Sequence, residues 1–574
     1  MIDPRLVRMK TVLRRTLYSF LIVGSAACPN NTGPSFRPCT AADAPVTLAV
    51  NQYVTIDPAA DSGCMVFPAT TTSAADYLLI PQLTSGVPGQ QAGFRLVGDT
   101  ILPAPGPSPA LLPTAAEVGP ADAFHTFLRL GDEHRNWGFA PEGGYGAPTG
   151  QPQRSAAASP PGMGSLRIFQ VCAKTDCSTF DRVGARVRAV SNKVVIYVDT
   201  LAPAGGLDST ALDSIATLFD QKLYAIDTAA FGRESDIDSN TVVMVLMTNT
   251  VNKLVTATAC AQSGFVAGFF FGADLDPAFQ NDSRSNKGEV FYSIVADPAG
   301  TLSCAHPASD VEKFVPVTFI HEFQHMISFN QHVLMRGGTG EVLWLNEGLS
   351  HYAEELGGRS YTGAPDATVA NCAIGQVDCR FYGGDLLDAY QYMDSISKYF
   401  LIPTAGIGSL PERGAAWMFV RYVVDQYAAG TTMADWNAIT RSLDATAQTG
   451  AQNVAAVTGD PFATVVTRWA LALFVTDRAG IPPELQYTSW DYHAVYSSLH
   501  TQAPNVFAAV YPLRAIVLPA RGISLVGTLR AGSGIYIRAT QSPADPGFTV
   551  SFTAPNGAPI SAALGPRLTV MRLQ

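Results

Sequence analysis

The sequence predicts an α+β protein: a central domain with a mixed sheet and one long helix, then a helical subdomain, flanked by small β-rich domains. Three observations predict this class. Short runs in which apolar and polar residues alternate occur near both ends of the chain. Continuous apolar runs, typical of buried strands, precede a long apolar stretch of helical length in the middle. After that stretch, apolar residues recur at the spacing of a helix face, which indicates a largely helical second half.

A chain of 574 residues is too long for a single hydrophobic core, so we expect about three folded units. Hydrophobic residues make up 47% of the chain and charged residues 15%, which is typical of a folded protein. The formal net charge is −10, and we find no basic stripe. Binding to nucleic acid through phosphate contacts is therefore not expected, because it needs clustered Lys and Arg.

Residues 1–28 have the features of an export signal. A positively charged stretch is followed by the apolar run 17–27, which is shorter than the ~20 residues that span a bilayer. Small residues lead directly into Cys28, as in bacterial lipoprotein signals, in which that cysteine carries lipid after cleavage. Ser25 stands where such signals prefer a larger apolar residue, so a lipidated and a simply secreted protein both stay open. We therefore expect an extracytoplasmic protein, secreted or lipid-anchored to the bacterial cell envelope, with residues 29–45 as a polar tether.

Of the nine cysteines, eight remain when Cys28 is set aside. An even number suits the oxidising compartment that the export signal indicates. Close spacing favours disulfides that close small loops, and free buried thiols are the alternative. We expect four pairs: Cys172 with Cys177, Cys372 with Cys379, Cys39 with Cys64, and Cys260 with Cys304.

The first β-rich domain is predicted at residues 46–140. Alternating runs at 46–50, 77–80 and 94–97 indicate strands between turn clusters. Residues 141–184 begin with a stretch dense in Gly, Pro, Ala and Ser, which is typical of a linker or a long surface loop. An N-terminal region of this kind could also be a propeptide that is removed on activation.

The central domain is predicted at residues 185–400, the helical subdomain at 401–502 and a final sandwich-like β domain at 503–574. In the central domain we expect a helix at 209–223, a longer helix at 314–329, and strands at 193–198, 242–247, 265–271 and 289–295. Helical spacing indicates further helices at 412–427 and 462–475, and alternation returns at 516–518, 523–526, 535–538 and 548–552. We find no internal repeat.

A metal-binding pattern lies on the long predicted helix. His321-Glu-Phe-Gln-His325 matches H-E-x-x-H, in which two histidines four residues apart share a helix face and reach one metal ion. Glu322 follows the first histidine and projects beside the ion, which suits a general base that takes a proton from water. A bare match of this kind also arises by chance, so a third ligand is needed to support it.

Glu347 is the candidate third ligand, because it follows His325 by twenty-two residues and lies near the start of a second predicted helix. Catalytic zinc takes three protein ligands and leaves one position open, and two histidines with a glutamate are one known set. Gly357 and Gly358 are expected to end the second helix. The alternative is an exposed acidic residue on a surface helix.

These segments resemble the gluzincin metallopeptidases, and within them most of all the hyicolysin family. The likeness covers roughly residues 190–430 and rests on residues 321–327 and 344–351, with further similarity at 236–247 and 288–292. It implies a zincin-like catalytic domain in which three residues hold zinc and a fourth is the catalytic acid and base: His321, His325 and Glu347 as ligands, and Glu322. It also implies a zinc endopeptidase that acts on proteins or peptides.

The sequence departs from the pattern of thermolysin-like gluzincins four residues after the third ligand. Those enzymes have an aspartate there that orients the first histidine, whereas this chain has His351, so another acceptor must serve His321. His351 either faces the cleft and stabilises the oxyanion or is a surface histidine. A tyrosine with that role has no clear counterpart, and the candidates are Tyr382, Tyr399 and Tyr422. The aminopeptidase motif G-A-M-E-N is absent from the sequence, which favours cutting within chains.

Two weaker features complete the set of candidate sites. Residues 264–271 resemble an edge strand that aligns an extended substrate through backbone hydrogen bonds, although a buried strand is equally compatible. Asp236, Asp238 and Asn240 offer hard oxygen ligands for calcium, but the glycine and glutamate that an EF-hand loop needs further on are missing. A polar turn before a strand is the alternative for this segment.

Metal-assisted hydrolysis of protein or peptide substrates is therefore the function that the sequence predicts. One rival is a zincin-like scaffold that only binds or adheres, with the β domains providing recognition, and another is an aminopeptidase of the same clan. Glu322 argues against a pure binder, because binding needs no base beside the metal. The sequence gives no indication of the oligomeric state.

Overall fold

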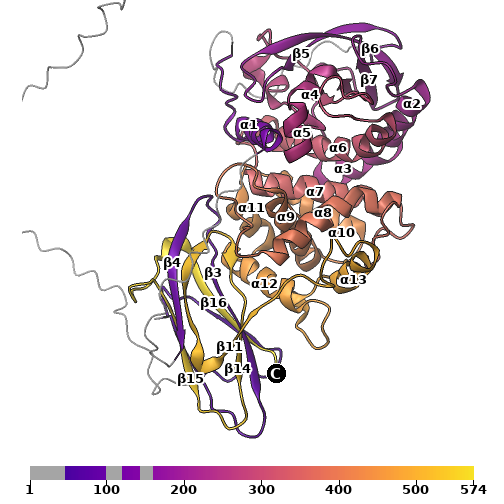
Figure 1. The fold of residues 1–574 in the computed structure, drawn as a ribbon. Helices are drawn as coiled ribbons and strands as arrows, with labels where there is room; N and C mark the ends of the chain where they lie inside the picture. Colours follow the sequence, from indigo (N-terminus) through magenta and orange to yellow (C-terminus); the bar gives the residue numbers. More distant parts are fainter. Residues whose placement is uncertain (1–44, 62, 99–118, 142–158) are drawn as a thin grey trace, which may run out of the picture. The chain divides into compact units, whose positions relative to one another are not determined.

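The computed structural model describes residues 45–61, 63–98, 119–141 and 159–574 (Figure 1). The predicted signal with Cys28, the tether up to residue 44 and much of the Gly- and Pro-rich stretch after residue 141 lie outside the described residues. The described part contains three β-sheets together with many helices, which agrees with the predicted α+β class. None of the helices in this part is long and apolar enough to cross a membrane.

Strands from both ends of the chain build two β-sheets that share one core. The N-terminal strands are β1 (Tyr53–Ile56), β2 (Cys64–Phe67), β3 (Ala75–Leu83) and β4 (Gln91–Gly98). The C-terminal strands are β11 (Ile516–Pro519), β12 (Ser524–Arg530), β13 (Ser533–Gly534), β14 (Ile537–Gln541), β15 (Phe548–Thr553) and β16 (Pro566–Arg572). One sheet has the order β1-β16-β3-β14-β11, with β13 beside β3, and the other has the order β12-β4-β15-β2. Leu79, Phe94 and Phe548 belong to the core that the two sheets share.

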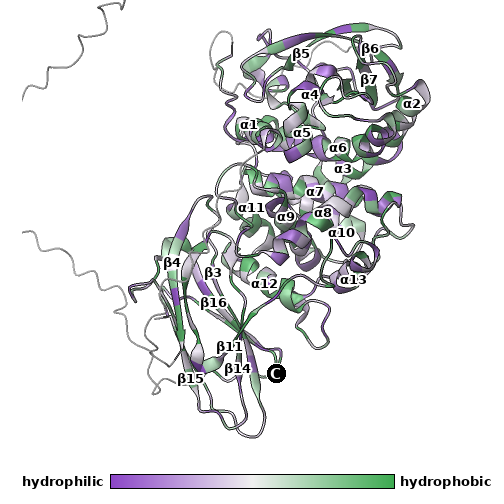
Figure 2. Ribbon diagram, viewed as in Figure 1, coloured by the Kyte–Doolittle hydropathy of each residue, from purple (hydrophilic) through white to green (hydrophobic). Residues whose placement is uncertain are grey.

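The two β domains expected as separate units, at residues 46–140 and 503–574, are therefore one two-sheet unit. Alternation, which Figure 2 shows along β4, identifies a half-buried strand but not its partner. β3 lies between β16 and β14, and all its residues are buried. Removal of the N-terminal strands would open this core, so the structure does not support the propeptide alternative for them. The expected strand at 46–50 is coil and turn.

A linker was predicted at 141–184. The prediction is wrong for the described residues at the end of this range, because they form strands. β5 (Leu166–Cys172) pairs antiparallel with β6 (Phe180–Val190). From Val183 onward, buried residues alternate with more exposed ones along β6, so the signal for a strand is present in the sequence. A helix, α1 (Pro120–His134), lies in what was expected to be a β-rich region.

The central sheet has the order β5-β6-β7-β8-β10-β9. β7 (Val194–Asp199), β8 (Val243–Met247) and β10 (Val290–Ser293) run parallel, and β9 (Gly268–Phe270) is the antiparallel edge strand. These four strands overlap the four predicted segments. Their residues are almost all buried, which explains why their sequences are continuously apolar rather than alternating.

Helices make up much of the rest of the described chain. Before the second half lie α2 (Ser209–Leu218), α3 (Tyr224–Phe231), α4 (Asn249–Lys253), α5 (Ala257–Ser263) and α6 (Ala308–Phe329). The second half contains α7 (Leu343–Arg359), α8 (Val377–Asp394), α9 (Leu410–Tyr427), α10 (Met433–Asp444), α11 (Gly450–Thr458), α12 (Phe462–Val475) and α13 (Tyr492–Gln502). α6 packs against α7, and α9 packs against both α7 and α8. These contacts hold the helix with the H-E-x-x-H pattern against the helix with Glu347.

The glycines expected to end the second helix lie inside it, because α7 continues to Arg359. A Cβ atom at Gly358 would come within 2.4 Å of Tyr382 Cδ1 and 2.7 Å of the Asp378 backbone oxygen, both on α8. At Gly357 it would come within 2.7 Å of the Phe381 ring. The pair therefore permits close packing of α7 on α8 rather than a helix end.

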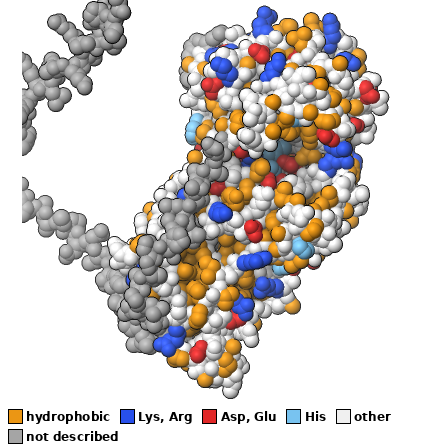
Figure 3. Space-filling model, viewed as in Figure 1, with side chains coloured by type: hydrophobic (Ala, Val, Ile, Leu, Met, Phe, Trp, Pro, Cys, Tyr) orange, Lys and Arg blue, Asp and Glu red, His pale blue; other side chains and the backbone are white. Residues whose placement is uncertain are grey.

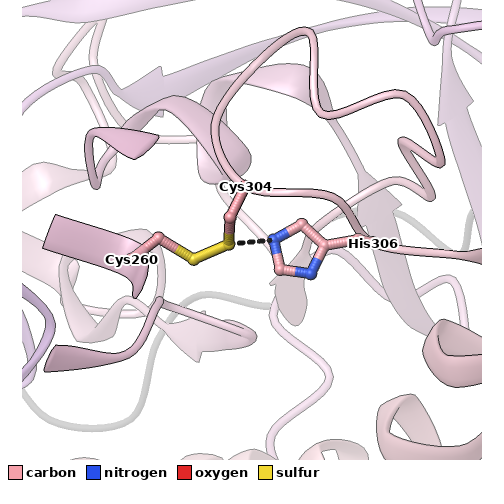
Figure 4. Close-up of side chains that lie close together, drawn as sticks. All are labelled: Cys260, Cys304 and His306. Carbon is pink, nitrogen blue, oxygen red and sulfur yellow. Dashed lines mark hydrogen bonds between the residues drawn. A yellow bond between two sulfur atoms is a disulfide. The ribbon is translucent and has the colours of Figure 1, made fainter. Parts of the chain in front are cut away.

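Three of the four expected disulfides are present: Cys172 with Cys177, Cys260 with Cys304, and Cys372 with Cys379. Cys64 is disulfide-bonded as well, and its expected partner Cys39 lies outside the described residues. The bond from Cys260 to Cys304 joins α5 to the segment before α6, and His306 lies beside it with its Nε2 3.5 Å from Cys304 Sγ (Figure 4). Free buried thiols are thus excluded for these described cysteines.

Candidate metal centre

α6 places His321 and His325 one helical turn apart with their side chains facing each other. Their Nε2 atoms are 3.2 Å apart. The helix is buried around them, with Phe319, Ile320 and Phe323 in the core, so the apolar run that predicted the helix also fixes its rotation. The side chain of His325 is 1% exposed and that of His321 13% exposed.

The other ring nitrogens of both histidines are held by residues of α7. His325 Nδ1 lies 2.9 Å from Asn346 Oδ1, and His321 Nδ1 lies 2.7 Å from Glu354 Oε1. Metal-binding imidazoles usually donate their second N–H to such an acceptor, which orients the ring. Glu354 is thus the acceptor for His321 that the sequence left unassigned. Burial, with the charges of Arg129 and His321 adding, holds the pKa of His325 well below its ordinary value, so this imidazole is neutral.

Glu347 in the first turns of α7 completes the cluster. One carboxylate oxygen lies 3.8 Å from His321 Nε2 and the other lies 3.6 Å from His325 Nε2. α7 approaches α9 closely here, since a Cβ at Gly348 would come within 2.9 Å of the Ala416 backbone oxygen. A tetrahedral zinc ion with ligands at 2.0–2.1 Å separates its ligand atoms by about 3.3 Å. The observed separations of 3.2, 3.6 and 3.8 Å therefore suit a zinc ion between the three side chains.

A second set of nearby ligand atoms comes from His321, His351 and Glu354. Here Glu354 Oε1 lies between two imidazole nitrogens, 2.7 Å from His321 Nδ1 and 3.1 Å from His351 Nδ1. These are hydrogen-bond distances, so the carboxylate accepts from both rings. The Nε2 atoms of His321 and His325 and the carboxylate of Glu347 lie close together and are the candidate ligand atoms.

His351 is buried behind His321 rather than on the surface, which excludes the surface alternative. Its Nδ1 lies 2.7 Å from Asp385 Oδ1 and 3.1 Å from Glu354 Oε1. Burial opposes protonation of the ring, but the two carboxylates outweigh it and raise the pKa of His351 well above its ordinary value. The charged ring stabilises Glu354, whose carboxylate in turn orients His321.

Glu322 lies beside this cluster, with one carboxylate oxygen within 4.8 Å of a ring nitrogen of His321 and of His325, and it also contacts the edge strand β9. It is 2% exposed, and its Oε2 accepts a hydrogen bond of 2.9 Å from the Phe270 backbone N–H. Burial raises the pKa of Glu322, and the charge of Arg129 opposes that rise. The second oxygen, Oε1, has His125 Nδ1 at 4.0 Å as its neighbour.

Two residues near Glu322 come from α1, and sequence reasoning missed both. Arg129 is 1% exposed, donates to the Phe270 backbone oxygen at 2.7 Å, and lies 4.0 Å from Glu322 Oε2. Burial holds the pKa of His125 well below its ordinary value, helped by the charges of Arg413 and Arg129. The sequence contains one signal for Arg129, which is a charged residue on the apolar face of an amphipathic helix. Nothing in the sequence links this residue to the distant H-E-x-x-H motif.

The expected substrate-aligning strand lies at the sheet edge, as β9. At Phe270, however, its outward backbone N–H and C=O bond Glu322 and Arg129. Two of the three tyrosines considered for the oxyanion are engaged elsewhere: Tyr382 OH donates to Asp378 and Tyr422 OH donates to the Glu484 backbone oxygen. The structure therefore gives neither tyrosine a contact that supports the role.

Figure 3 shows histidine and acidic side chains close together in the hollow near the middle of the view. Asp236 and Asp238, considered for calcium, lie apart from this cluster in the loop before β8. Asn240, the third residue considered, donates from its side-chain amide to Asp238 and accepts from the Val242 backbone N–H.

No family model matches the chain. The chain is similar to the neutral metalloprotease ShpI of Staphylococcus hyicus, with 29% identity over 144 residues. The similar stretch covers 25% of this chain and 30% of that protein. Similarity to a metalloprotease agrees with the presence of histidine and carboxylate groups that suit a metal ion.

Proposed function

We propose that the protein is a zinc-dependent endopeptidase of the gluzincin type, related to the hyicolysin family, that hydrolyses peptide bonds in proteins. One observation carries the proposal: His321, His325 and Glu347 converge at zinc-binding separations with Glu322 beside them. Partial similarity to a metalloprotease supports the same reading. Three protein ligands leave a fourth position open, which is typical of catalytic rather than structural zinc.

Zinc, when bound, supplies Lewis-acid polarisation of the scissile carbonyl and makes water a better nucleophile near neutral pH. The protein contributes the orientation of the ligands. Glu354 and Asn346 hold Nδ1 of the two histidines, so that both Nε2 atoms face the ion.

Glu322 is the general base and then the general acid in this proposal. Its Oε2 is held by the Phe270 N–H, which leaves Oε1 to take the proton from water and pass it to the leaving amine. The base is desolvated, which strengthens it, while the charge of Arg129 favours its ionised form. A protein that only binds peptides has no need for this arrangement.

The cellular setting follows from the sequence and the disulfides together. Three disulfides among the described residues suit an oxidising compartment, and we propose secretion or lipid anchoring through Cys28 to the cell envelope. Replacement of Cys28 by Ser is expected to release an anchored protein from the membrane fraction.

Hydrolysis of casein by the purified chain, with and without phenanthroline, tests the proposal. Glu322→Gln is expected to abolish cleavage while zinc stays near one per chain, because Glu322 lies beside the ligands and not among them. Glu312→Gln on the exposed face of α6 is the matched control and is expected to cleave normally. Substantial cleavage by zinc-loaded Glu322→Gln would remove Glu322 from the base role. Zinc without cleavage in the unaltered protein would favour the binding scaffold, and release of single terminal residues would favour the aminopeptidase.

A further inference from the structure

A second cluster of acidic side chains lies outside the candidate zinc site. Asp236, Asp238 and Glu289 each bring one carboxylate oxygen within 4.8 Å of the others. Asp236 and Asp238 are partly exposed, whereas Glu289 is 1% exposed. Asp236 also lines a cavity of about 400 Å³.

The topology of the central sheet brings these residues together. β8 and β10 are parallel neighbours, with Met244 opposite Val290, so the segments that lead into them lie at the same edge. Glu289 immediately precedes β10, and its backbone oxygen accepts from the Met244 N–H at 2.8 Å. The loop with Asp236 and Asp238 leads into β8. An EF-hand takes its acidic residues from a single loop. Here the third carboxylate comes from Glu289, which precedes β10, the neighbour of β8 in the sheet.

The hydrogen bonds of Glu289 leave one oxygen without a partner. Its Oε1 accepts from the Ile237 backbone N–H at 3.0 Å and from Ser235 Oγ at 2.5 Å. Its Oε2 is buried and has no hydrogen-bond partner among the described residues. A buried carboxylate oxygen that has left water without gaining a partner is costly, and a bound cation would satisfy it.

The charges around the cluster also favour a bound cation. Burial raises the pKa of Glu289 to about 7, and the charge of Asp238 adds to the rise. Burial also raises the pKa of Asp238, with Asp236 adding to it and Arg167 opposing it. Arg167 itself donates to the Asn286 backbone oxygen and contacts Met244 Sδ, so its hydrogen bonds serve other groups. The three carboxylates repel one another and are not fully neutralised by the protein.

We propose that Asp236, Asp238 and Glu289 form a calcium site that joins the loop before β8 to the start of β10. Three carboxylates offer only oxygen ligands, and Ca²⁺ takes six to eight of these, with water and backbone carbonyls filling the rest. Partial exposure of two of the three suits an ion that keeps some water. β10 pairs with β9, which carries the Phe270 N–H that holds Glu322. The site would therefore stiffen the sheet edge beside the catalytic base, but it stands whether or not the chain is a peptidase.

Calcium binding to the full, zinc-loaded chain tests this inference without any measure of activity. Isothermal titration with CaCl₂ is expected to give one site per chain. The unfolding midpoint is expected to rise by about 2 °C at a calcium concentration of about 100 times Kd. Glu289→Gln is expected to weaken binding by about tenfold or more and to remove the shift. Without calcium this variant is expected to unfold at the same temperature as the unaltered protein or higher, since repulsion is relieved.

Two further variants keep the test decisive. Asp236→Asn, which alters a partly exposed residue, is expected to fold and to lose the calcium response even if Glu289→Gln does not fold. Asp213→Asn, an exposed change of the same charge on α2, is the control and is expected to bind calcium normally. An unaltered protein with no calcium-dependent shift, an Asp236→Asn variant that binds normally, or tighter binding of Mg²⁺ than of Ca²⁺ would each overturn the assignment.

Discussion

Replacement of Glu354 tests whether the structure has identified the residue that orients His321. In the proposed site Glu354 does not bind the ion, but its carboxylate holds Nδ1 of His321 at 2.7 Å. Burial opposes ionisation of Glu354, yet the charge of His351 and the bond to His321 hold its pKa at about 2. The carboxylate is therefore ionised at every pH at which the assay is run. Glu354→Gln keeps the shape of the side chain and removes this charge.

The size of the effect follows from the contacts that are lost. Hydrogen bonds to an ionised acceptor are roughly twice as strong as neutral ones. Loss of the partner of a metal-binding histidine costs about 10- to 100-fold in metal affinity, or about 1.4–2.7 kcal/mol. Glu354→Gln retains an amide oxygen that accepts from Nδ1–H, so we expect about 10-fold. Glu354→Ala leaves that N–H without an acceptor, so we expect about 100-fold. Glu347→Ala removes a ligand and is expected to weaken binding further still.

Competition between the protein and a chromogenic zinc chelator measures these affinities directly, and casein cleavage at saturating zinc measures the activity of each variant. The expected order of zinc affinity is unaltered protein, Glu354→Gln, Glu354→Ala and Glu347→Ala. An unchanged affinity in both Glu354 variants would refute the orienting role. Weaker binding in Glu354→Ala than in Glu347→Ala would refute the ligand set itself and make Glu354 a ligand.

Three further predictions concern the base, the buried acids and the disulfides. Arg129→Gln is expected to lower kcat by roughly 10- to 100-fold and to leave zinc binding unchanged. The reason is that Arg129 contacts Phe270 and Glu322 rather than the candidate zinc ligands. Steady-state kinetics measure kcat, and metal analysis measures the zinc content. Burial raises the pKa of Glu341 to about 7. The folded chain thus holds a proton that the unfolded chain releases, and the free energy of unfolding falls between about pH 4.5 and 7, by on the order of 3 kcal/mol. Glu341→Gln is expected to remove its share of the fall in urea unfolding across that range, while other buried acids with a raised pKa, such as Glu289, keep theirs. Joint replacement of Cys260 and Cys304 by Ala, 44 residues apart, is expected to cost about 4 kcal/mol in urea unfolding.

Each of these has a matched control. Arg129→Lys retains the positive charge but loses the several N–H donors of the guanidinium group. Full activity in this variant would leave Arg129 with only an electrostatic role. Asp310→Asn, an exposed change, is expected to leave the pH dependence of stability unaltered. Removal of the Cys172–Cys177 bond, which closes a loop of only a few residues, is expected to cost about 2 kcal/mol, so equal losses from both pairs would contradict the loop-length argument.

Local spacing was enough to identify the helices that carry the candidate site. The 3.6-residue period places His321 and His325 on one face, and the apolar residues around them force that face toward the core. The same period identified the helix of Glu347, and continuous apolar runs identified β7, β8 and β10. Neither inference needs information about a distant residue, which is why both agree with the structure.

Partners contributed by distant residues could not be inferred in this way. The sequence predicts alternating strands at both ends of the chain, but only the structure shows that β16 pairs with β3 across the whole length of the protein. Gly357 and Gly358 are equally suited to a helix end and to a close helix contact, and the position of α8 decides between them.

The sequence by itself therefore determined the residue types and the spacing of a candidate metal-binding pattern, together with the class of the fold. Tertiary structure alone decided which groups surround that pattern, with Glu354 as the acceptor for His321 and Arg129 beside Glu322. It also brought Glu289 beside Asp236 in the separate acidic cluster. The physical reason is range. Helical and strand periodicity act over a few residues, whereas the hydrogen bonds and charges that tune a buried site depend on side chains that only chain packing brings within a few ångströms.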